Sequence, residues 1–371
     1  MSAPGRPKRE LLPLGGKARS AKGAPMIERQ QIRLGRECRP ILVVVIHTEE
    51  EFDWDKPHDR NATSVAHMRH IDRAQRLFDQ FWIVPNYVVD YPIASQAEAF
   101  GPLRTYADAG RALIGAHLHP WVSPPHEEEV NARNSYPGNQ PRALEHEKLR
   151  VLTDRIAAAF GTRPVTYLAG RYGFGPNTGE ILEALGYEVD ISAAASIDYS
   201  ADGGPDYSGC TSDHYWFGRS RRLLGLPGSG GYVGWLRAGG TPLYRRLTRP
   251  WLRRARVSGI VARLRLLERI RLSPEDYTEP EMRRLTGALL ADGVSVFVFS
   301  FHSPSVMPGG TPYVRSDIEL ARFLEKCRRY FDYFLRDLGG TAMTPLAVKD
   351  RLMRIAPPDR LPATALAARD P

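Results

Sequence analysis

The feature that most constrains the fold of this chain is an alternation of strand and helix patterns between residues 39 and 352. Apolar runs rich in β-branched or aromatic residues, such as "ILVVVI" (41–46) and "VSVFVFSFH" (294–302), predict strands buried on both faces. Amphipathic stretches such as "ALEHEKLRVLTDRIAAAFG" (143–161) predict helices that cover them. Repeated strand–helix order implies parallel strands joined by right-handed crossovers. We therefore predict an α/β fold, and the number of units favours a barrel over an open sheet.

The remaining segments follow the same order. Further strands are predicted at 82–89, 111–116 and 164–169, and further helices at 65–81, 177–187 and 315–340. Gly161 is expected to end the helix over 143–161, and Asn177 is expected to begin the next one.

The two ends of the chain lack this periodicity. Residues 1–38 are rich in Gly, Pro and basic residues, and 353–371 has a similar character. We predict a disordered basic segment over 1–38, one barrel domain over 39–352 and a flexible tail over 353–371.

Charge and cysteine content narrow the cellular setting. The chain has 371 residues and a formal net charge of +9, which suggests an anionic partner or simply a well-solvated surface. Cys38, Cys210 and Cys327 form no CxxC pair, which is typical of free thiols in a reducing compartment. We find no apolar core of signal-peptide length and no apolar run long enough to span a membrane, and therefore expect a cytoplasmic protein.

Ionisable side chains gather where the predicted strands end. In α/β barrels the reactive residues lie just past the C-terminal ends of the strands. At these positions the chain places His47 and Glu49 to Glu51, His117 and His119, Arg171 to Gly173, Asp190, and His302. Five strand ends would then deliver His, Glu, Asp or Arg to one rim.

Each of these residues alone has a structural explanation. A His-x-His pair is often part of a loop, a glutamate run is usually solvated, and a lone histidine often bonds to backbone. A carboxylate with two imidazoles, however, is a chemically sensible site for a divalent metal such as zinc, with one position left for water. A further ionisable residue could then act as acid or base.

Four motifs, in this order, resemble a known family. "VVIHTEEEFDW", "IGAHLHPW", "AGRYGFG" and "FSFHSPS" are similar to the NodB-homology polysaccharide deacetylases (carbohydrate esterase family 4), and most similar to the WalW-type branch. The resemblance covers roughly residues 40–350. It implies a distorted (β/α)7 barrel that removes N-acetyl or O-acetyl groups from saccharides by metal-assisted hydrolysis.

The resemblance also implies roles for particular residues. Glu49, His117 and His119 resemble the metal ligands, usually of zinc, and His302 resembles the general acid. Expected substrate contacts are Tyr172, Gly173, Asp190 and Trp121.

Two positions depart from the family pattern. His47 stands where the family has an aspartate as general base, and Leu168 stands where it has an arginine, although Arg171 could substitute as a catalytic residue. Losing both together avoids an unpaired buried charge. His47 could be the base, or an extra metal ligand, or hydrolysis could be weakened or lost, leaving a barrel that binds a saccharide or an anionic glycolipid.

A basic insertion is predicted over about 219–280. Between Arg219 and Arg271 there are fourteen arginines and one acid, Glu268, and residues 245–272 have helical apolar spacing. Such a helix could lie on an anionic membrane surface, grip sugar phosphates, bind nucleic acid without sequence preference, or simply cover the barrel. Among the functional options we favour a glycolipid substrate at the membrane surface, and expect no specific nucleic acid.

Overall fold

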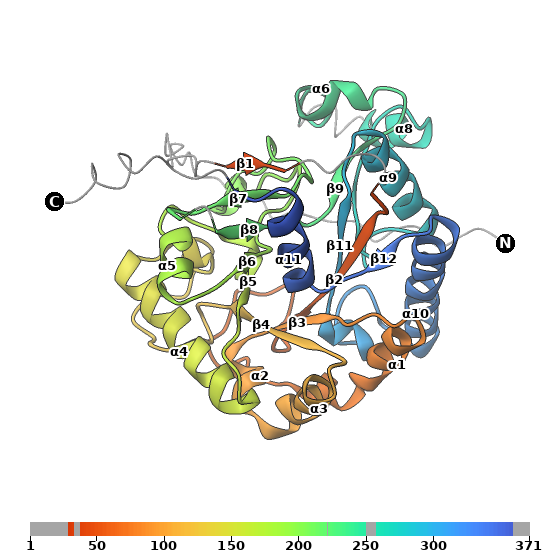
Figure 1. Ribbon diagram of the computed structural model, residues 1–371. Coiled ribbons are helices and arrows are strands. Elements are labelled where there is room, and N and C mark those ends of the chain that lie inside the picture. Colours follow the sequence, from red (N-terminus) through yellow and green to blue (C-terminus); the bar gives the residue numbers. More distant parts are fainter. Residues whose placement is uncertain (1–28, 33–37, 221, 250–256, 359–371) are drawn as a thin grey trace.

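A parallel sheet organises the molecule (Figure 1). The computed structural model describes residues 29–32, 38–220, 222–249 and 257–358. Seven parallel strands lie in the order β11-β2-β3-β4-β5-β6-β8, which confirms the predicted α/β class. Their bounds are β2 Ile41–Thr48, β3 Asn86–Val89, β4 Leu113–Leu118, β5 Thr166–Ala169, β6 Val189–Asp190, β8 Leu223–Gly225 and β11 Val296–His302.

The two ends of this parallel set approach each other without a strand ladder between β8 and β11 in the described part of the chain. Ser229, four residues after β8, accepts a hydrogen bond from the Val298 amide of β11 on its Oγ at 2.8 Å. The Ser300 amide donates to the Leu272 carbonyl at 3.2 Å, and the Leu272 amide donates to the Ser229 carbonyl at 2.8 Å. The sheet is therefore a distorted barrel, bridged at one seam by irregular backbone.

Five further strands lie outside this set. β12 Thr341–Ala342 runs parallel to β2, β1 Gln30–Gln31 pairs antiparallel with β7 Tyr215–Phe217, and β9 Gly230–Val233 pairs with β10 Glu268–Arg271. The prediction of a disordered segment over 1–38 is therefore wrong for residues 30–31; residues 1–28 and 33–37 lie outside the described part.

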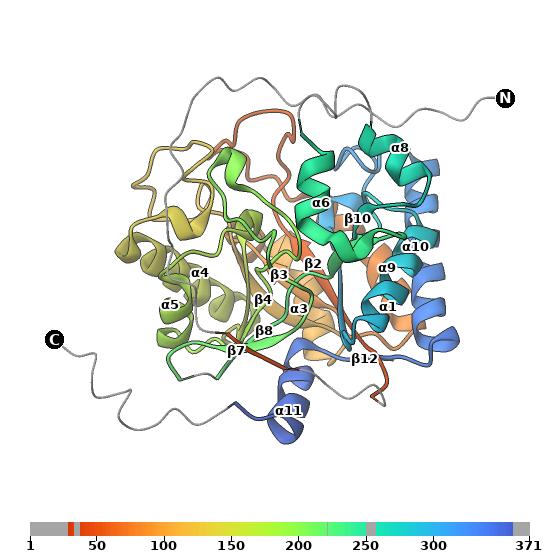
Figure 2. The same ribbon diagram turned by 90° about the horizontal axis from the view of Figure 1, so that it is seen from above.

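Helices surround the strands (Figure 2). The α-helices are α1 Asp72–Gln80, α2 Tyr91–Ser95, α3 Ala97–Asp108, α4 Arg142–Phe160, α5 Thr178–Ala184, α6 Gly240–Leu247, α8 Val257–Arg263, α9 Glu279–Ala291, α10 Asp317–Asp332 and α11 Pro345–Ile355. Short 3-10 turns occur at Ala66–His70, Pro137–Asn139, Gly170–Tyr172, Ser200–Asp202, Arg237–Gly239 and Ser303–Val306, and a π-helical turn at Tyr333–Asp337.

The predicted helix ends are partly right. Gly161 ends α4 with φ 75°, a left-handed conformation that glycine adopts without steric cost, as predicted. Asn177 does precede α5, but its side chain makes no capping hydrogen bond. At the chain end, α11 continues to Ile355, so the flexible tail does not begin at residue 353.

The basic insertion is not purely helical, which corrects the prediction for 219–280. It contains β8, a member of the parallel set, and the β9–β10 pair. The helical spacing over 245–272 ends in strand β10, because Glu268–Arg271 hydrogen-bonds to β9 instead of continuing α8. Residues 250–256 of this stretch lie outside the described part of the chain.

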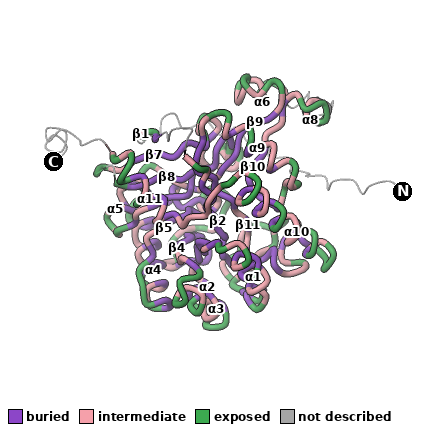
Figure 3. The backbone as a smooth tube through the Cα atoms, turned by 45° about the vertical axis from the view of Figure 1, so that its right-hand side comes forward, coloured by how far each residue is buried: buried purple, intermediate pink, exposed green. Residues whose placement is uncertain are grey.

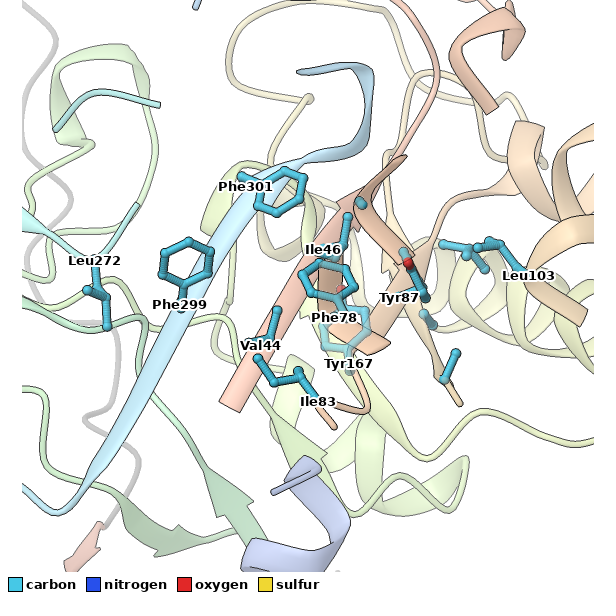
Figure 4. Close-up of a cluster of buried hydrophobic side chains, with 14 of the residues drawn as sticks. Val44, Ile46, Phe78, Ile83, Tyr87, Leu103, Tyr167, Leu272, Phe299 and Phe301 are labelled. Carbon is cyan, nitrogen blue, oxygen red and sulfur yellow. The ribbon is translucent and has the colours of Figure 1, made fainter. Parts of the chain in front are cut away.

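Figure 3 shows that the central strands are buried, and their side chains divide between two apolar clusters, one of which is drawn in Figure 4. In β2, Val44 and Ile46 pack in the cluster that includes Phe78 of α1 and Phe299 of β11. Successive side chains of a strand point to opposite faces. The odd-numbered residues of β2 therefore belong to the barrel interior.

The interior cluster closes one end of the barrel. Val43 and Val45 of β2 share this cluster with Val298 of β11 and with Val348 and Leu352 of α11. α11 thus fills the end of the barrel from which the parallel strands start. The other end, where the strands finish, carries the polar residues.

Candidate metal and acid–base site

Three histidines face the interior at the C-terminal strand ends. His47 follows Val45 on the interior face of β2, and His302 follows Val298 and Ser300 on the interior face of β11. The rings of His47 and His302 have centroids 4.7 Å apart, and those of His47 and His117 are 5.3 Å apart. The two-residue period of the strands is what brings these side chains together.

Glu49, His117 and His119 converge on one point. His117 Nε2 lies 3.3 Å and His119 Nε2 lies 3.5 Å from Glu49 Oε2. All three side chains are buried, and the other oxygen of Glu49, Oε1, has no hydrogen-bond partner. Their ligand atoms lie within 4.8 Å of one another. A buried carboxylate oxygen without a partner, beside two imidazole nitrogens, is what a divalent cation would satisfy.

The far nitrogens of both imidazoles are already held. His117 Nδ1 lies 2.8 Å from the carbonyl oxygen of Leu168, so Nδ1 carries the proton and Nε2 keeps its lone pair. His119 Nδ1 lies 2.8 Å from Glu50 Oε2. Such outer partners fix the ring orientation and tautomer of metal-binding histidines. The residues therefore fit a divalent metal, and Leu168 contributes to that geometry through its backbone.

Glu50 is the centre of a second buried network. Its carboxylate accepts a hydrogen bond from Trp121 Nε1 at 2.7 Å, and its amide donates to Asp90 Oδ2 at 2.7 Å. Burial, together with the charge of Glu49, raises the pKa of Glu50 to about 7, and burial also raises the pKa of Asp90 well above its usual value. The network supports His119 from behind.

Trp121 takes part in this support. It is 1% exposed and stacks on His119, with ring centroids 4.2 Å apart. Its substrate contact stays a prediction.

The other two histidines differ in charge. Burial lowers the pKa of His302, but Glu275 and Glu49 outweigh this and raise it to about 9. Burial and the neighbouring His302 and His117 lower the pKa of His47 well below 6.5. Near pH 7 the site thus holds a neutral imidazole beside a protonated one. Pairs of titratable groups pushed apart in pKa are typical of acid–base catalysis.

Glu275 was missed by sequence reasoning. Its Oε2 lies 2.8 Å from His302 Nδ1, and its Oε1 accepts from the His302 amide at 3.0 Å and from Ser305 Oγ at 2.6 Å. The residue lies in "RLSPEDY", an irregular segment after β10 with no periodic signal. In the sequence, nothing distinguishes Glu275 from nearby acidic residues such as Asp276.

Arg171 points into the rim loop. Its guanidinium hydrogen-bonds to Asp202 and, at 2.5 Å, to Ser135 Oγ, and it lies 4.2 Å over the Tyr136 ring. The "SADGGPDYSG" segment (200–209), which contains Asp202, is thereby tied to the end of β5. These contacts describe a loop anchor, and the catalytic role of Arg171 stays a prediction.

The other predicted substrate contacts lie at different depths. The Tyr172 ring meets the edge of His47 at a centroid distance of 5.6 Å. Gly173 is buried, and a Cβ there would stand 2.7 Å from Pro137 Cδ. Asp190 is 2% exposed and accepts from Ser192 Oγ at 2.5 Å. Only Tyr172 among these three is shown in contact with a site histidine, and all three roles stay predictions.

Two further side chains reach the site that sequence reasoning did not single out. Trp54 lies edge-on to His302 at a centroid distance of 4.9 Å. Arg271, the last residue of β10, lies 4.9 Å over the Tyr172 ring and donates to its hydroxyl.

Solved structures that are similar to this chain were found, but only at low identity. A protein described as a polysaccharide deacetylase from Mycobacterium smegmatis is 14% identical, with a TM-score of 0.47 over 90% of this chain and 98% of that chain. One described as a polysaccharide deacetylase from Pseudomonas aeruginosa PAO1 is 14% identical, with a TM-score of 0.49 over 86% of this chain and 92% of that chain. An allantoinase, PuuE, is 14% identical, with a TM-score of 0.47 over 86% and 92%. No protein-family model and no curated protein matches the chain.

Proposed function

We propose that this chain is a metal-dependent deacetylase of the NodB-homology type that hydrolyses N-acetyl or O-acetyl groups of a saccharide. The observation that carries the proposal is the convergence of His117 Nε2 and His119 Nε2 on Glu49 Oε2, at 3.3 and 3.5 Å. Two imidazoles and one carboxylate are a ligand set that catalytic zinc accepts, so zinc is the metal we propose.

The residues of the chain divide the work of hydrolysis between them. A divalent cation held by Glu49, His117 and His119 would supply Lewis acidity toward the acetyl carbonyl and the attacking water. His47, neutral near pH 7, takes a proton from the water as its oxygen attacks the carbonyl carbon. His302, protonated near pH 7, gives a proton to the leaving nitrogen or oxygen of the sugar, and acetate departs.

A second candidate is an impaired barrel that binds a saccharide or an anionic glycolipid without hydrolysing it. The depressed pKa of His47 favours this alternative, because a base that holds a proton weakly assists water attack less well. This second candidate has the same metal site as the first, but it does not hydrolyse the bound saccharide.

Metal analysis and acetate release separate the two candidates. We expect purified protein to hold about one zinc per chain and to release acetate from acetylated oligosaccharides. His47→Asn should then abolish release, with His146→Asn on α4 as the matched control. If acetate appears only after His47→Asp, the natural protein is the impaired form. Protein that binds no divalent metal contradicts both candidates.

We further propose that the deacetylase meets its substrate at an anionic membrane surface, where it binds peripherally from the cytoplasmic side. In the described part of the chain, no helix is both long and apolar enough to cross a bilayer. However, Trp235 (87% exposed), Leu236 (45%) and Leu264 (61%) present apolar side chains to solvent, near the exposed Arg263 and Arg265.

These residues lie on two segments, one shortly before α6 and one directly after α8 in the sequence, and Figure 1 shows α6 and α8 at the outer edge of the molecule. The Trp235 amide donates to the Arg265 carbonyl at 3.2 Å, and the Leu236 amide donates to the Leu266 carbonyl at 2.8 Å. An aromatic and aliphatic tip surrounded by arginines suits the interface of an anionic bilayer.

Vesicle flotation tests this membrane contact. We expect binding to phosphatidylglycerol-containing vesicles and none to phosphatidylcholine alone, with loss of binding in the double variant Trp235→Ser/Leu264→Ser. Trp82, which is 91% exposed outside the 235–265 region, supplies the control variant Trp82→Ser. If the double variant floats with the vesicles as well as the wild type does, the surface around Trp235 and Leu264 is not the membrane-binding surface.

A further inference from the structure

Arg271 approaches the site from outside the parallel sheet. It ends β10 opposite Gly230 of β9, in the two-stranded sheet of the basic insertion. Its guanidinium lies 4.9 Å over the Tyr172 ring and donates to the Tyr172 hydroxyl, and the same ring meets the edge of His47 at 5.6 Å. One aromatic ring therefore separates this arginine from His47.

The charge of Arg271 reaches the histidines. It is one of the causes that lower the pKa of His47 and one that opposes the raised pKa of His302.

Arg271 lacks a carboxylate partner. Among the described residues, no Asp or Glu oxygen lies within 4.0 Å of its guanidinium, and the Tyr172 hydroxyl is the only protein acceptor it meets. Other arginines at this rim are paired: Arg171 with Asp202, and Arg245 with Asp206 at 2.7 Å. A guanidinium has five N–H donors in a planar fork, so most of the donors of Arg271 remain for another acceptor.

We propose that Arg271 binds an anionic group of the saccharide, a carboxylate or a phosphate, held beside the acetyl group that is removed. This inference rests on the proposed deacetylase function and adds the substrate class to it. The planar fork of arginine matches the two oxygens of a carboxylate or phosphate with parallel hydrogen bonds. Tyr172, whose ring stacks on Tyr199 at 5.7 Å, holds the guanidinium in place from one side.

Arg269 provides a matched control on the same strand. It lies two residues before Arg271, donates to the Ser196 carbonyl at 3.3 Å, and lies 5.2 Å over the Tyr244 ring. Arg269→Gln therefore removes the same charge from β10 without touching Tyr172.

The experiment compares three acetylated sugars in wild type, Arg271→Gln, Arg271→Lys and Arg269→Gln. The sugars are a tetrasaccharide that alternates N-acetylglucosamine with glucuronate, the neutral chitotetraose, and the anomeric phosphate of N-acetylglucosamine. We expect Arg271→Gln to raise KM about 10- to 100-fold for one anionic sugar, with the neutral sugar changed less than about 3-fold. Arg271→Lys should recover part of the loss, and Arg269→Gln should match wild type. The anionic sugar that responds identifies the source, carboxylate or phosphate.

A binding measurement keeps this inference separate from catalysis. Calorimetric titration of the same sugars measures affinity whether or not acetate is released. Charge-dependent binding without turnover would overturn the proposed deacetylase activity and leave the role of Arg271 standing. Equal losses on neutral and anionic sugars would make Arg271 only a support for Tyr172, and no difference between Arg271→Gln and wild type would overturn the inference outright.

Discussion

In two corners of the site a carboxyl group contacts the Nδ1 atom of a histidine, but the two histidines have very different pKa values. In the ligand corner (Glu49, Glu50, His117, His119, Trp121), Glu50 holds His119 Nδ1 at 2.8 Å. In the proton-transfer corner (His47, Tyr172, Arg271, Glu275, His302), Glu275 holds His302 Nδ1, also at 2.8 Å. Yet the pKa of His119 is well below 6.5, through burial and the neighbouring His117, whereas that of His302 is about 9.

The balance between burial and neighbouring charges explains the difference in pKa. The pKa of Glu50 is raised to about 7 by burial and by Glu49, so Glu50 is often protonated. Burial alone would raise the pKa of Glu275. The charge of His302, together with the hydrogen bonds from His302 and Ser305, outweighs burial, so the pKa is lowered and Glu275 is charged. For His119, burial and the neighbouring His117 outweigh the opposite effect of Glu49, so this histidine is neutral, which suits the proposed metal ligand. For His302, the charges of Glu275 and Glu49 outweigh burial, so this histidine is protonated, which suits the proposed acid.

The strongest test of the ligand corner removes Glu49. We expect Glu49→Gln to reduce zinc affinity by more than about 100-fold, because losing a direct ligand costs more than losing an outer partner. Zinc per chain after dialysis measures this. Glu51→Gln is the control, since Glu51 bonds instead to His67 and Ser64. Full zinc content in Glu49→Gln would show that the metal lies elsewhere.

A smaller loss is expected when the holding carboxyl of this corner is changed. Glu50→Gln should weaken zinc binding about 10- to 100-fold, because His119 Nδ1 loses its acceptor oxygen or gains a weaker one. Competition with a zinc chelator gives the affinity. An unchanged affinity would mean that Glu50 does not orient His119.

In the proton-transfer corner, the corresponding substitution is Glu275→Gln, and it should shift the pH dependence of kcat/KM. Without the Glu275 charge, the pKa of His302 falls. An acid works only while protonated, so the alkaline limb of kcat/KM moves to lower pH, by about one unit or more. We expect kcat/KM of Glu275→Gln to be roughly tenfold below that of the wild type at pH 9, and to differ less at pH 6.

Glu268→Gln serves as the control for this profile, since Glu268 pairs with Arg284. A profile of Glu275→Gln that drops equally at all pH values would argue against His302 as the acid.

The smallest effect is expected from Trp121→Phe. The ring still stacks on His119, but Glu50 loses the hydrogen bond from Nε1, worth about 1 kcal/mol. Zinc affinity should fall only a few-fold. A loss as large as that of Glu50→Gln would mean that Trp121, and not Glu50, dominates the support of His119.

The sequence was most informative where a site residue ends a periodic strand. The β-branched run of β2 predicted the interior strand, and the two-residue period of β2, β4 and β11 explains why His47, His117 and His302 share one space. The resemblance then suggested roles for Glu49 and His119. Sequence reasoning was wrong where strand pairing overrode the local spacing of apolar residues. The β10 segment has helical apolar spacing, but it forms a strand that pairs with β9.

By itself, then, the sequence determined the parallel α/β architecture and the set of ionisable residues at the strand ends, because both follow from short-range periodicity. Only the tertiary structure decided which carboxyl holds which histidine. Glu275 lies 27 residues from His302 along the chain, and Glu50 lies 69 residues from His119. Burial and neighbouring charge, which set the pKa of each group, exist only after these distant segments have packed together.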